Sequence, residues 1–444
     1  MNLRVNPINS INGEVKAPPS KSYSHRAFIA ASLAEGVSII KKPLIVGDVE
    51  VSIEILKKLG VKILKEGKDT YIVEKMNKTY KKRDQVLDCR NSGTSIRIFS
   101  ALSLLIEGGL SFKGRFLRRK RPILPLLDSL KKLGADYQLT KNKLFIHRIK
   151  NNCDKIKIRG DISSQFITAL LMICPLLICE KEDFITIEVN TPIVSYPYVE
   201  ITKHILESFG INIFEELNAE KIGKYYISTQ QNYRTQIFEI PGDFSSIANI
   251  IAAAIISPED SQVVIDNLNF KKPQGDKKVI EILQDFGANI EIDQKTNRVI
   301  VYGNRNKNTL KGLDIDIYEN PDLFPILAVV GAFAKNKTTL FNASNLRLKE
   351  SDRISIVARE LAKMGVKVKE DKDKLTVYHC KKLKGSEINH EEDHRIAMAF
   401  TIAALYADSI SRINNIEIIK DSYPNFIYDL QTLGAKIVSE DGFI

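Results

Sequence analysis

One pattern recurs six times along this chain: a helix with apolar residues at helical spacing, a glycine, and then a β-rich stretch. Each glycine stands just after the helix, where a residue with positive φ closes the last turn. Neighbouring glycines are 74, 76, 77, 78 and 69 residues apart, and this near-constant spacing indicates an internal repeat. The six glycines are Gly60, Gly134, Gly210, Gly287, Gly365 and Gly434.

Each repeat is long enough for two helices and several strands, which predicts an α/β architecture with helices packed on sheets. The stretch after each glycine alternates apolar and polar residues, as in VKILKEG after Gly60, so a strand or hairpin is expected there. Six repeats could close into one ring or form two groups of three, and the pattern leaves both arrangements open. With 444 residues, the chain is long enough for two or more domains.

The net charge of +11 is compatible with binding to nucleic acid, a membrane surface or small anions. Acidic residues are interleaved with the lysines almost everywhere, as in EDKDK, so most basic residues are expected on an ordinary solvated surface. The clustered acidic residues Asp322, Glu350 and Asp393 would repel a phosphate backbone. We therefore expect no nucleic-acid partner and a small anionic substrate.

The remaining composition argues against a metal, a disulfide framework and a membrane. No CxxC pair is present, and the histidines show no ligand spacing, so reduced thiols in a cytoplasm and no metal are expected. The first residues lack the apolar region of a signal peptide. The longest apolar run, 166–179, contains Pro175 and is too short to span a bilayer, so it predicts a buried helix. The five cysteines are Cys89, Cys153, Cys174, Cys179 and Cys380.

The stretch APPSKSYSHRA, residues 17–27, has the features of an anion site, although the Walker GxxxxGK[ST] frame is missing. Ser20 is expected to cap a helix, which places Lys21 and Ser22 at its N-terminus, where unpaired backbone N–H groups favour anions. Ser22 and Arg26 are four residues apart and share a helix face. On this stretch alone, an ordinary capped helix with surface charges explains the pattern equally well.

Similar polar groups stand before several other apolar helices. Any one of them could be a plain cap, as is common for an acid such as Asp322, but their recurrence favours one cleft lined by helix N-termini. Lys349 and Arg353 are predicted to share one helix face. The residues are Asn91, Gly93 and Arg97; Arg121; Ser163, Ser164 and Gln165; Ser195 and Tyr198; Asp322; Asn345, Lys349, Glu350, Asp352 and Arg353; and Asp393, His394 and Arg395.

Seven of these motifs, in this order, resemble the 5-enolpyruvylshikimate-3-phosphate synthases, also called 3-phosphoshikimate 1-carboxyvinyltransferases. They are PPSKSYSHRA, RNSGTSIR, RKRPI, SSQFITALL, NPD, NLRLKESDR and DHRIAMAF, and the resemblance runs from about residue 10 to 430. It implies an inside-out α/β barrel fold with two globular domains, each of three βαβαββ units. The expected domains are 1–19 plus 241–444, which is discontinuous, and 20–240, with the active-site cleft between them.

The resemblance implies transfer of the enolpyruvyl group of phosphoenolpyruvate to the 5-hydroxyl of shikimate 3-phosphate, with release of phosphate. This reaction belongs to the shikimate pathway, which supplies chorismate and the aromatic amino acids, and the family is a target of glyphosate. The resemblance further implies a monomer in the cytoplasm, without cofactor, metal or membrane. Two alternatives are weaker. The sister transferase that acts on a UDP-amino sugar usually has a cysteine in the loop matching 114–121, which is absent here, and the catalytic histidine motif of an RNA-end-processing cyclase is not found.

The family's residue roles carry over to matching positions. Asp322 is the implied base for the 5-hydroxyl, Glu350 the proton shuttle at the methylene carbon, and Lys21 the proton partner on the opposite side. The implied shikimate 3-phosphate ligands are Lys21, Ser22, Arg26, Ser163, Ser164, Gln165, Ser195, Tyr198, Asp322, Asn345 and Lys349, with Ser22 and Arg26 on its carboxylate. The implied phosphoenolpyruvate ligands are Lys21, Asn91, Gly93, Arg121, Gln165, Arg353, His394 and Arg395.

The segment IIKDSYPNF departs from the family pattern. Many members carry a lysine two residues before the aromatic–proline pair, but here Asp421 holds that position and Lys420 precedes it. Two interpretations stay open. A local backbone shift could bring Lys420 to phosphoenolpyruvate, or Lys420 could be a solvent-exposed lysine whose role the arginines fulfil.

Overall fold

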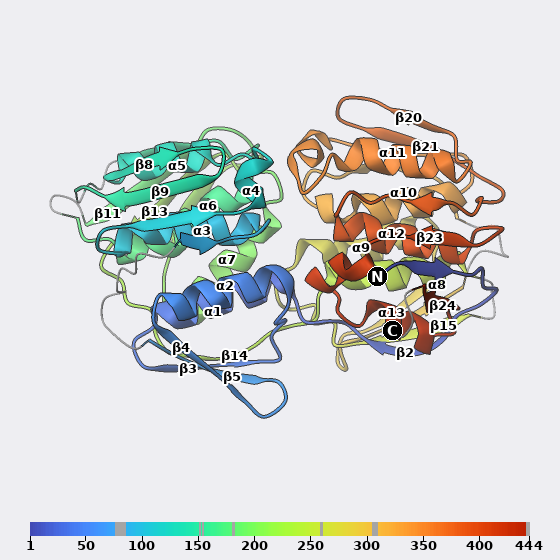
Figure 1. Ribbon diagram of the computed structural model, residues 1–444, viewed down its shortest axis with the longest axis horizontal. Helices are drawn as coiled ribbons and strands as arrows, with labels where there is room; N and C mark the ends of the chain where they lie inside the picture. The colour runs from blue at the N-terminus through green and yellow to red at the C-terminus, as the bar shows by residue number, and fades with distance from the viewer. Residues whose placement is uncertain are drawn as a thin grey trace. The chain divides into compact units, whose positions relative to one another are not determined.

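The computed structural model describes residues 1–75, 86–150, 152, 155–179, 183–257, 261–303 and 310–440 (Figure 1). Its chain divides into two compact units. The first unit combines residues 1–18 with 241–444, and the second unit comprises residues 19–240.

Each unit contains three four-stranded sheets, and all six sheets share one strand order. The first two strands are parallel, and the third lies antiparallel between the second and the fourth. In the first unit the sheets are β2 (Asn12–Lys16), β15 (Gln262–Asp266), β17 (Arg298–Tyr302) and β16 (Ile290–Asp293); β18 (Asp314–Asp316), β19 (Lys337–Phe341), β21 (Leu375–Tyr378) and β20 (Val368–Glu370); and β22 (Glu387–Ile388), β23 (Ser411–Ile413), β1 (Leu3–Val5) and β24 (Ile437–Ser439).

In the second unit the same order gives β14 (Ile237–Glu239), β3 (Val37–Lys41), β5 (Thr70–Lys75) and β4 (Val61–Glu66); β6 (Val86–Asp88), β7 (Leu110–Lys113), β9 (Lys143–Arg148) and β8 (Ala135–Leu139); and β10 (Ile156–Ile158), β11 (Phe184–Val189), β13 (Gly223–Ser228) and β12 (Phe214–Leu217). Strands from distant parts of the chain complete three of the sheets. For example, β14 pairs in parallel with β3, and β2 with β15.

The helices connect the strands within each repeat. The second unit contains α1 (Lys21–Leu33), α2 (Gly47–Lys58), α3 (Gly93–Leu102), α4 (Arg115–Arg118), α5 (Leu124–Lys132), α6 (Ser164–Ile173) and α7 (Pro197–Ser208), with the 3-10 turns η1 (Ser103–Leu105) and η2 (Cys174–Leu176). The first unit contains α8 (Phe244–Ile256), α9 (Val279–Asp285), α10 (Phe324–Phe333), α11 (Arg353–Lys363), α12 (His394–Leu405) and α13 (Phe426–Thr432), with η3 (Gly275–Lys278), η4 (Pro321–Leu323), η5 (Ser344–Leu348) and η6 (Ile416–Asp421).

The six repeat glycines behave as the sequence predicts. Each follows one helix of its repeat by two residues and leads into the strand or hairpin expected after it. Their φ angles are 97°, 92°, 81°, 100°, 84° and 104° in chain order, a conformation that a side chain disfavours. The α/β repeat architecture is therefore confirmed.

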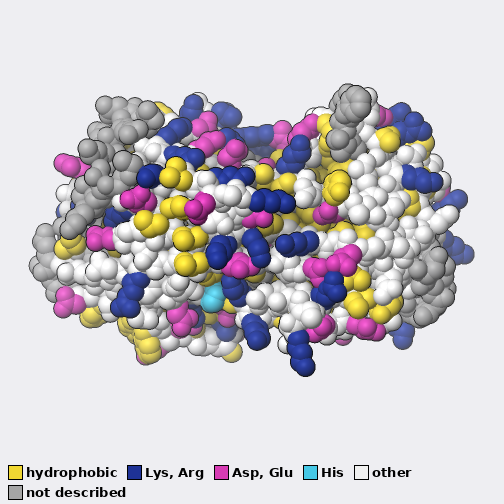
Figure 2. Space-filling view, turned by 90° about the horizontal axis from the view of Figure 1, so that it is seen from below, with side chains coloured by type: hydrophobic (Ala, Val, Ile, Leu, Met, Phe, Trp, Pro, Cys, Tyr) yellow, Lys and Arg dark blue, Asp and Glu magenta, His cyan; other side chains and the backbone are white. Residues whose placement is uncertain are grey.

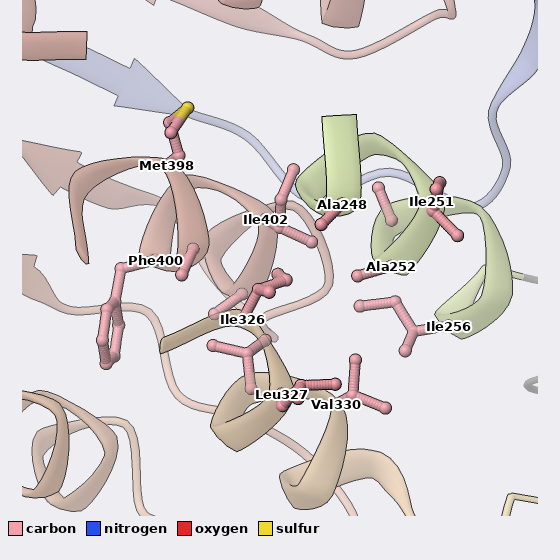
Figure 3. Packing of buried hydrophobic residues seen from close by; sticks show 14 of the residues in the cluster. Ala248, Ile251, Ala252, Ile256, Ile326, Leu327, Val330, Met398, Phe400 and Ile402 are labelled. Atoms are coloured by element: carbon pink, nitrogen blue, oxygen red, sulfur yellow. The ribbon is translucent and has the colours of Figure 1, made fainter. Parts of the chain in front are cut away.

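Three apolar helices form the centre of the first unit. Every side chain of α8 is buried, as are those of α12 and nearly all of α10. Figure 3 shows that Ala252 and Ile256 of α8, Leu327 and Val330 of α10, and Ile402 of α12 converge between the helices. A helix that is apolar almost all round has no surface for water, so only its polar N-terminal end is available for chemistry.

The buried helix predicted over 166–179 is confirmed for its first part, as α6 followed by η2, which begins just before Pro175. Residues 177–179 are not helical, and Ile178 is exposed. Within the described ranges, no helix is long and apolar enough to cross a membrane. On the face that Figure 2 shows, Lys and Arg side chains are interspersed with Asp and Glu rather than gathered into one basic surface.

The expectation that all cysteines are reduced is wrong. Cys89, Cys174 and Cys380 are free thiols, but Cys179 is disulfide-bonded. Cys153 lies outside the described residues. Sequence spacing missed the bond because a disulfide depends on how the fold brings two Cβ atoms together, and no CxxC motif marks it.

Candidate active site

In the second unit, Arg26 of α1 links the N-terminal parts of three helices. It donates from Nε to Thr202 Oγ1 at 2.8 Å, from Nη2 to Thr168 Oγ1 at 3.3 Å and to the Tyr198 carbonyl at 3.3 Å, and from Nη1 to the Ser22 carbonyl at 2.9 Å. Thr168 and Thr202 lie in the second turns of α6 and α7, so the N-termini of α1, α6 and α7 lie side by side.

Arg26 is only 2% exposed, and these four acceptors are neutral oxygens. Burial lowers the pKa of Arg26 to about 10, which still leaves the guanidinium protonated at neutral pH. A buried cation held by neutral groups favours an anion nearby, because Coulomb attraction is weakly screened away from water. The predicted role of Arg26 toward a carboxylate is compatible with this environment.

Several predicted ligands at these helix starts have buried polar atoms without a hydrogen-bond partner among the described residues. They include Ser195 Oγ and Asn91 Oδ1. The hydroxyl of Ser20, which is predicted only as an N-cap, is buried without a partner in the same way. Ser195 also has a φ of 55°, an uncommon conformation for a residue with a side chain. A buried polar atom without a partner costs about 1–3 kcal/mol, which a polar ligand would recover.

Gly93, the first residue of α3, lies against three polar side chains. A Cβ atom there would stand 2.9 Å from Arg97 Nη1, 3.1 Å from Arg121 Nη2 and 3.2 Å from Gln165 Oε1. Arg97 Nη1 donates to Gln165 Oε1, and Arg121 Nη1 donates to the Asn91 carbonyl at 2.8 Å. We call Gly93, Arg97, Arg121 and Gln165 the Arg121 cluster.

The two guanidinium groups of the Arg121 cluster share one aromatic ring. Arg97 Cζ lies 4.9 Å, and Arg121 Cζ 5.0 Å, from the centroid of Phe116. This stacking holds two cations close together, which suits a ligand that carries more than one negative charge. Sequence reasoning noticed Arg97 but did not assign it to the site. Its signal was the four-residue spacing from Gly93, which places both on one helix face.

Lys21 begins α1, and its Nζ lies 3.6 Å from Asp48 Oδ2 in the first turn of α2. Ser20 occupies the predicted N-cap position, but its hydroxyl makes no capping hydrogen bond. Ser163 does cap α6 and accepts from the Gln165 backbone N–H at 3.3 Å, beside the buried Ser164. The sequence motifs do not include Asp48.

In the first unit, one buried arginine holds three carboxylates. Arg353, 1% exposed, donates from Nε to Asp393 Oδ2 at 2.8 Å, from Nη1 to Asp322 Oδ1 at 2.8 Å and from Nη2 to Glu350 Oε2 at 3.1 Å. Arg395 Nη2 lies 3.2 Å from Asp322 Oδ2. We call these five residues the Arg353 cluster. They come from η4, the segment before α11, the first turns of α11 and α12, and the N-cap of α12.

These charges stabilise one another. Burial alone would raise the pKa of Asp322, but Arg395 and Arg353, with Lys349, hold it well below its usual range. Burial alone would likewise lower the pKa of Arg353, but Asp393, Asp322 and Glu350 raise it well above its usual range. Asp322 and Arg353 are therefore both ionised at neutral pH.

One local prediction for this segment is wrong. Lys349 and Arg353 do not share a helix face, because η5 ends at Leu348, the backbone at Lys349 is extended, and α11 begins at Arg353. The alternative that Asp322 is a plain N-cap is excluded, because Asp322 lies within η4 and α10 begins only at Phe324. Its ion pairs with two arginines are a stronger local interaction than capping.

Three further predicted ligands also lie in the first unit. Asn345 in η5 is 6% exposed, and neither of its amide atoms has a hydrogen-bond partner among the described residues. His394 is buried at the start of α12, directly beside Arg395 in the chain. Lys420 is exposed in η6, and Asp421 is half-buried.

A family model for EPSP synthase (3-phosphoshikimate 1-carboxyvinyltransferase) matches residues 5–430. The chain is 41% identical over 441 residues to 3-phosphoshikimate 1-carboxyvinyltransferase of Methanocaldococcus jannaschii and 40% identical over 441 residues to that of Methanococcus vannielii, with 98% of this chain and 99% of each relative covered.

Solved structures share the fold at lower identity. EPSP synthase from Acinetobacter baumannii matches with a TM-score of 0.79 at 24% identity, covering 99% of this chain and all of that one. The enolpyruvyl transferase NikO from Streptomyces tendae also matches with a TM-score of 0.79, at 16% identity, covering 98% of both chains. The family model and the long, 40–41% identical relatives show that this chain belongs to the EPSP synthase family.

Proposed function

We propose that this chain transfers the enolpyruvyl group of phosphoenolpyruvate to the 5-hydroxyl of shikimate 3-phosphate and releases phosphate. The observation that carries the proposal is the Arg353 cluster, where one buried guanidinium binds both Asp322 and Glu350. Acid–base groups thus lie within hydrogen-bond distance of a cation that could hold a phosphate or carboxylate.

The reaction needs both kinds of group. Protonation of the methylene carbon of phosphoenolpyruvate and attack of the 5-hydroxyl oxygen on the adjacent carbon give a tetrahedral adduct. Loss of a methyl proton and departure of phosphate then restore the double bond. In this assignment Asp322 accepts the hydroxyl proton, Glu350 moves the proton to and from the carbon, and Lys21 stabilises charge on the opposite side.

In the ligand-free cluster Asp322 is a weak base, because Arg395 and Arg353 hold its pKa well below the usual range. Phosphoenolpyruvate would bind these same two arginines through its phosphate and carboxylate. Its negative charge would oppose the effect of the arginines on Asp322 and raise the pKa of that carboxyl. Substrate binding would therefore make Asp322 a stronger base only when its reaction partner is present.

The second unit supplies the complementary anion sites. We assign the phosphate and hydroxyls of shikimate 3-phosphate to the helix starts that carry Ser163, Ser164, Gln165, Ser195 and Tyr198, with Asn345 and Lys349 added from the first unit. Ser22 and Arg26 are assigned to its carboxylate. Two unit charges about 4 Å apart repel by about 4 kcal/mol at an effective dielectric near 20, so binding two anionic substrates together requires several fixed cations. The Arg121 cluster and Arg353 cluster supply them.

In this assignment the functional residues come from both units: Lys21 and the Arg121 cluster belong to one unit, and Asp322 and Glu350 to the other. We also propose that the protein is a cytoplasmic monomer that needs no cofactor. In the described part of the chain, no group of three or more His, Cys, Asp or Glu side chains is arranged to hold a metal.

Phosphate release measured with each substrate alone and with both together tests this function. We expect release only with both substrates, and unchanged release after exhaustive chelation with EDTA. Release from phosphoenolpyruvate alone, or a requirement for a UDP-amino sugar in place of shikimate 3-phosphate, would contradict the proposal. Loss of activity with EDTA and its return with a divalent ion would contradict the metal-free mechanism.

A further inference from the structure

Asp276, in η3, is a buried carboxyl of the first unit that none of the sequence motifs includes. It is 4% exposed and accepts two hydrogen bonds from different segments. Ser245 Oγ, in the first turn of α8, donates to Asp276 Oδ2, and Asn320 Nδ2 donates to Asp276 Oδ1 at 3.1 Å. Asn320 directly precedes Pro321 and Asp322.

Asn320 anchors the short turn that carries Asp322. Its carbonyl accepts from the Leu323 backbone N–H at 3.1 Å, its own N–H donates to the Ile317 carbonyl at 3.2 Å, and the residue is 2% exposed. Fixing the Asn320 side chain therefore fixes where η4 starts. Asp276 is the side chain that connects this turn with α8.

The segment before Asp276 is itself fastened to the start of α8. Gln274 Nε2 donates to the Gly242 carbonyl at 2.8 Å, and Gln274 Oε1 accepts from the Phe244 backbone N–H at 3.3 Å. The segment 274–276 is therefore attached to the N-terminus of α8 by hydrogen bonds of Gln274, and from this position Asp276 binds Asn320.

The charge of Asp276 acts on Asp322 as well. Burial, and then the charge of Asp322, raise the pKa of Asp276 to about 6, against the opposing effects of Ser245 and Arg395. Among the neighbouring elements, α8 contains no titratable residue. In η3, Lys278 is exposed, and Lys277 Nζ donates to the Phe270 carbonyl. Coulomb interactions are mutual, so an ionised Asp276 raises the pKa of Asp322 and makes it a better proton acceptor.

We propose that Asp276 is a positioning residue for Asp322: through Asn320 it fixes the turn that aims the Asp322 carboxylate, and through its own charge it makes that carboxylate a better proton acceptor than it would be without Asp276. This inference rests on the proposed function. Asp276 touches no substrate in this assignment and acts only through Asn320 and Asp322.

Two variants separate the two effects. Asn320→Ala breaks the hydrogen bond to the turn but keeps the Asp276 charge, whereas Asp276→Asn removes the charge at almost unchanged size. Asp293→Asn, the same substitution in an exposed hairpin of the same unit, is the matched control. A misplacement of catalytic groups by about 1 Å costs on the order of 10²-fold in rate, so we expect both test variants to lose about that factor in kcat.

The pH profile of kcat supplies the readout that a merely structural role would not change. In the wild type, kcat should fall as pH drops through about 6, where Asp276 becomes protonated. Asp276→Asn should lose this limb, and Asn320→Ala should retain it at a lower plateau. Both should leave the KM for phosphoenolpyruvate nearly unchanged, and the double variant should be less impaired than the product of the two single effects. Wild-type kcat in Asn320→Ala, or an unchanged acid limb in Asp276→Asn, would overturn the proposal.

A crystal structure of Asn320→Ala tests the positioning without any turnover. We expect Asp322 to lose its 2.8 Å contact with Arg353 Nη1. If this contact is retained, the positioning role is wrong even if the enzyme is active. If wild-type protein shows no phosphate release, the proposed function fails, while this structure still decides whether Asp276 and Asn320 place Asp322. Circular dichroism and thermal unfolding establish that each variant is folded.

Discussion

Replacing Arg353 by lysine is the most informative perturbation of the first unit, because the charge is kept and only the hydrogen-bond geometry changes. The planar guanidinium of Arg353 binds three carboxylates with three different nitrogen atoms, at 2.8, 2.8 and 3.1 Å. A lysine has one nitrogen and cannot span Asp393, Asp322 and Glu350 together.

The magnitude follows from these contacts. Arg353 donates four hydrogen bonds to these carboxylates, two of them to Asp393. A hydrogen bond to a charged group contributes about 1.5–3 kcal/mol, so losing two of the four predicts a loss of about 3–6 kcal/mol in the free energy of unfolding. Leaving a buried charge without its partner typically costs a similar 3–5 kcal/mol. At about 2–4 °C per kcal/mol for a domain of 150–250 residues, the thermal midpoint should fall by roughly 6 °C or more.

The pH dependence has a definite sign. In the wild type, the cations hold the pKa of Asp322 well below its usual value, so the stability that this group contributes is present at neutral pH and is lost as pH falls toward its pKa in the folded state. The variant holds Asp322 less strongly and has less of this stability to lose. The difference between wild type and Arg353→Lys should therefore be largest near pH 7 and shrink below about pH 4, the range of an unperturbed carboxyl.

Urea unfolding of both proteins over this pH range measures the effect. Arg298→Lys is the matched control, since Arg298 also pairs with two carboxylates, Asp266 and Glu14, but is 42% exposed. Exposed pairs contribute only about 0–1 kcal/mol, so the control should lie close to the wild type at every pH. Equal stability of Arg353→Lys and wild type at pH 7, or a difference that does not vary with pH, would refute the reasoning.

Four further predictions concern substrate binding and turnover. Lys21→Ala and Glu350→Ala should each lose about 10²–10⁴-fold in kcat with the fold retained, and near-wild-type rates in either variant would remove that residue from the mechanism. Gly93→Ala should raise the inhibition constant of glyphosate, which carries a phosphonate and a carboxylate, more than the KM for phosphoenolpyruvate, because the new Cβ would stand 2.9 Å from Arg97 Nη1 and 3.1 Å from Arg121 Nη2; absence of inhibition in the wild type would show that Gly93 is misplaced. If Lys420 binds phosphoenolpyruvate, Lys420→Ala should raise that KM by one to two powers of ten, the equivalent of about 1.5–3 kcal/mol, whereas an unchanged KM would assign Lys420 to the solvent-exposed surface. Small-angle scattering should show a smaller radius of gyration when shikimate 3-phosphate is added, since an anion relieves the repulsion among the cations. An unchanged radius of gyration at saturation would argue against this compaction.

The repeat architecture is predictable because it depends on local chemistry. A helix that ends in a left-handed residue favours glycine there, and six such glycines at regular spacing identify six equivalent repeats. The repeat pattern does not show that strands from distant parts of the chain complete three of the sheets. The pairing of β2 with β15, or of β14 with β3, joins strands that lie far apart in the chain, and no local signal marks such a partner.

The candidate site divides in the same way. Polar residues at the starts of apolar helices are recognisable from sequence, and Asp322, Arg353 and Arg395 do meet in one cluster. The geometry within the cluster is not recognisable, because it depends on where α11 begins. Helical spacing applied to Lys349 and Arg353 fails for this reason.

Asp276 shows the limit of motif reasoning most clearly. It stands in QGDKK, a short polar segment that resembles any surface loop, yet it is 4% exposed and bonded to the turn before Asp322. Its importance arises from three segments that the fold assembles, namely the start of α8, η3 and Asn320. Only the packed structure reveals a buried acid of this kind.

Product analysis in D2O tests the central claim most directly. Phosphoenolpyruvate labelled with ¹³C, shikimate 3-phosphate and the wild-type protein are combined, and the product is followed by ¹³C and ³¹P NMR. We predict that the label becomes attached to the 5-oxygen of shikimate 3-phosphate, that inorganic phosphate appears in equal amount, and that deuterium enters the methylene group as Glu350 moves protons to and from that carbon. Unchanged substrates, or phosphate formed without transfer of the label, would contradict enolpyruvyl transfer by this protein.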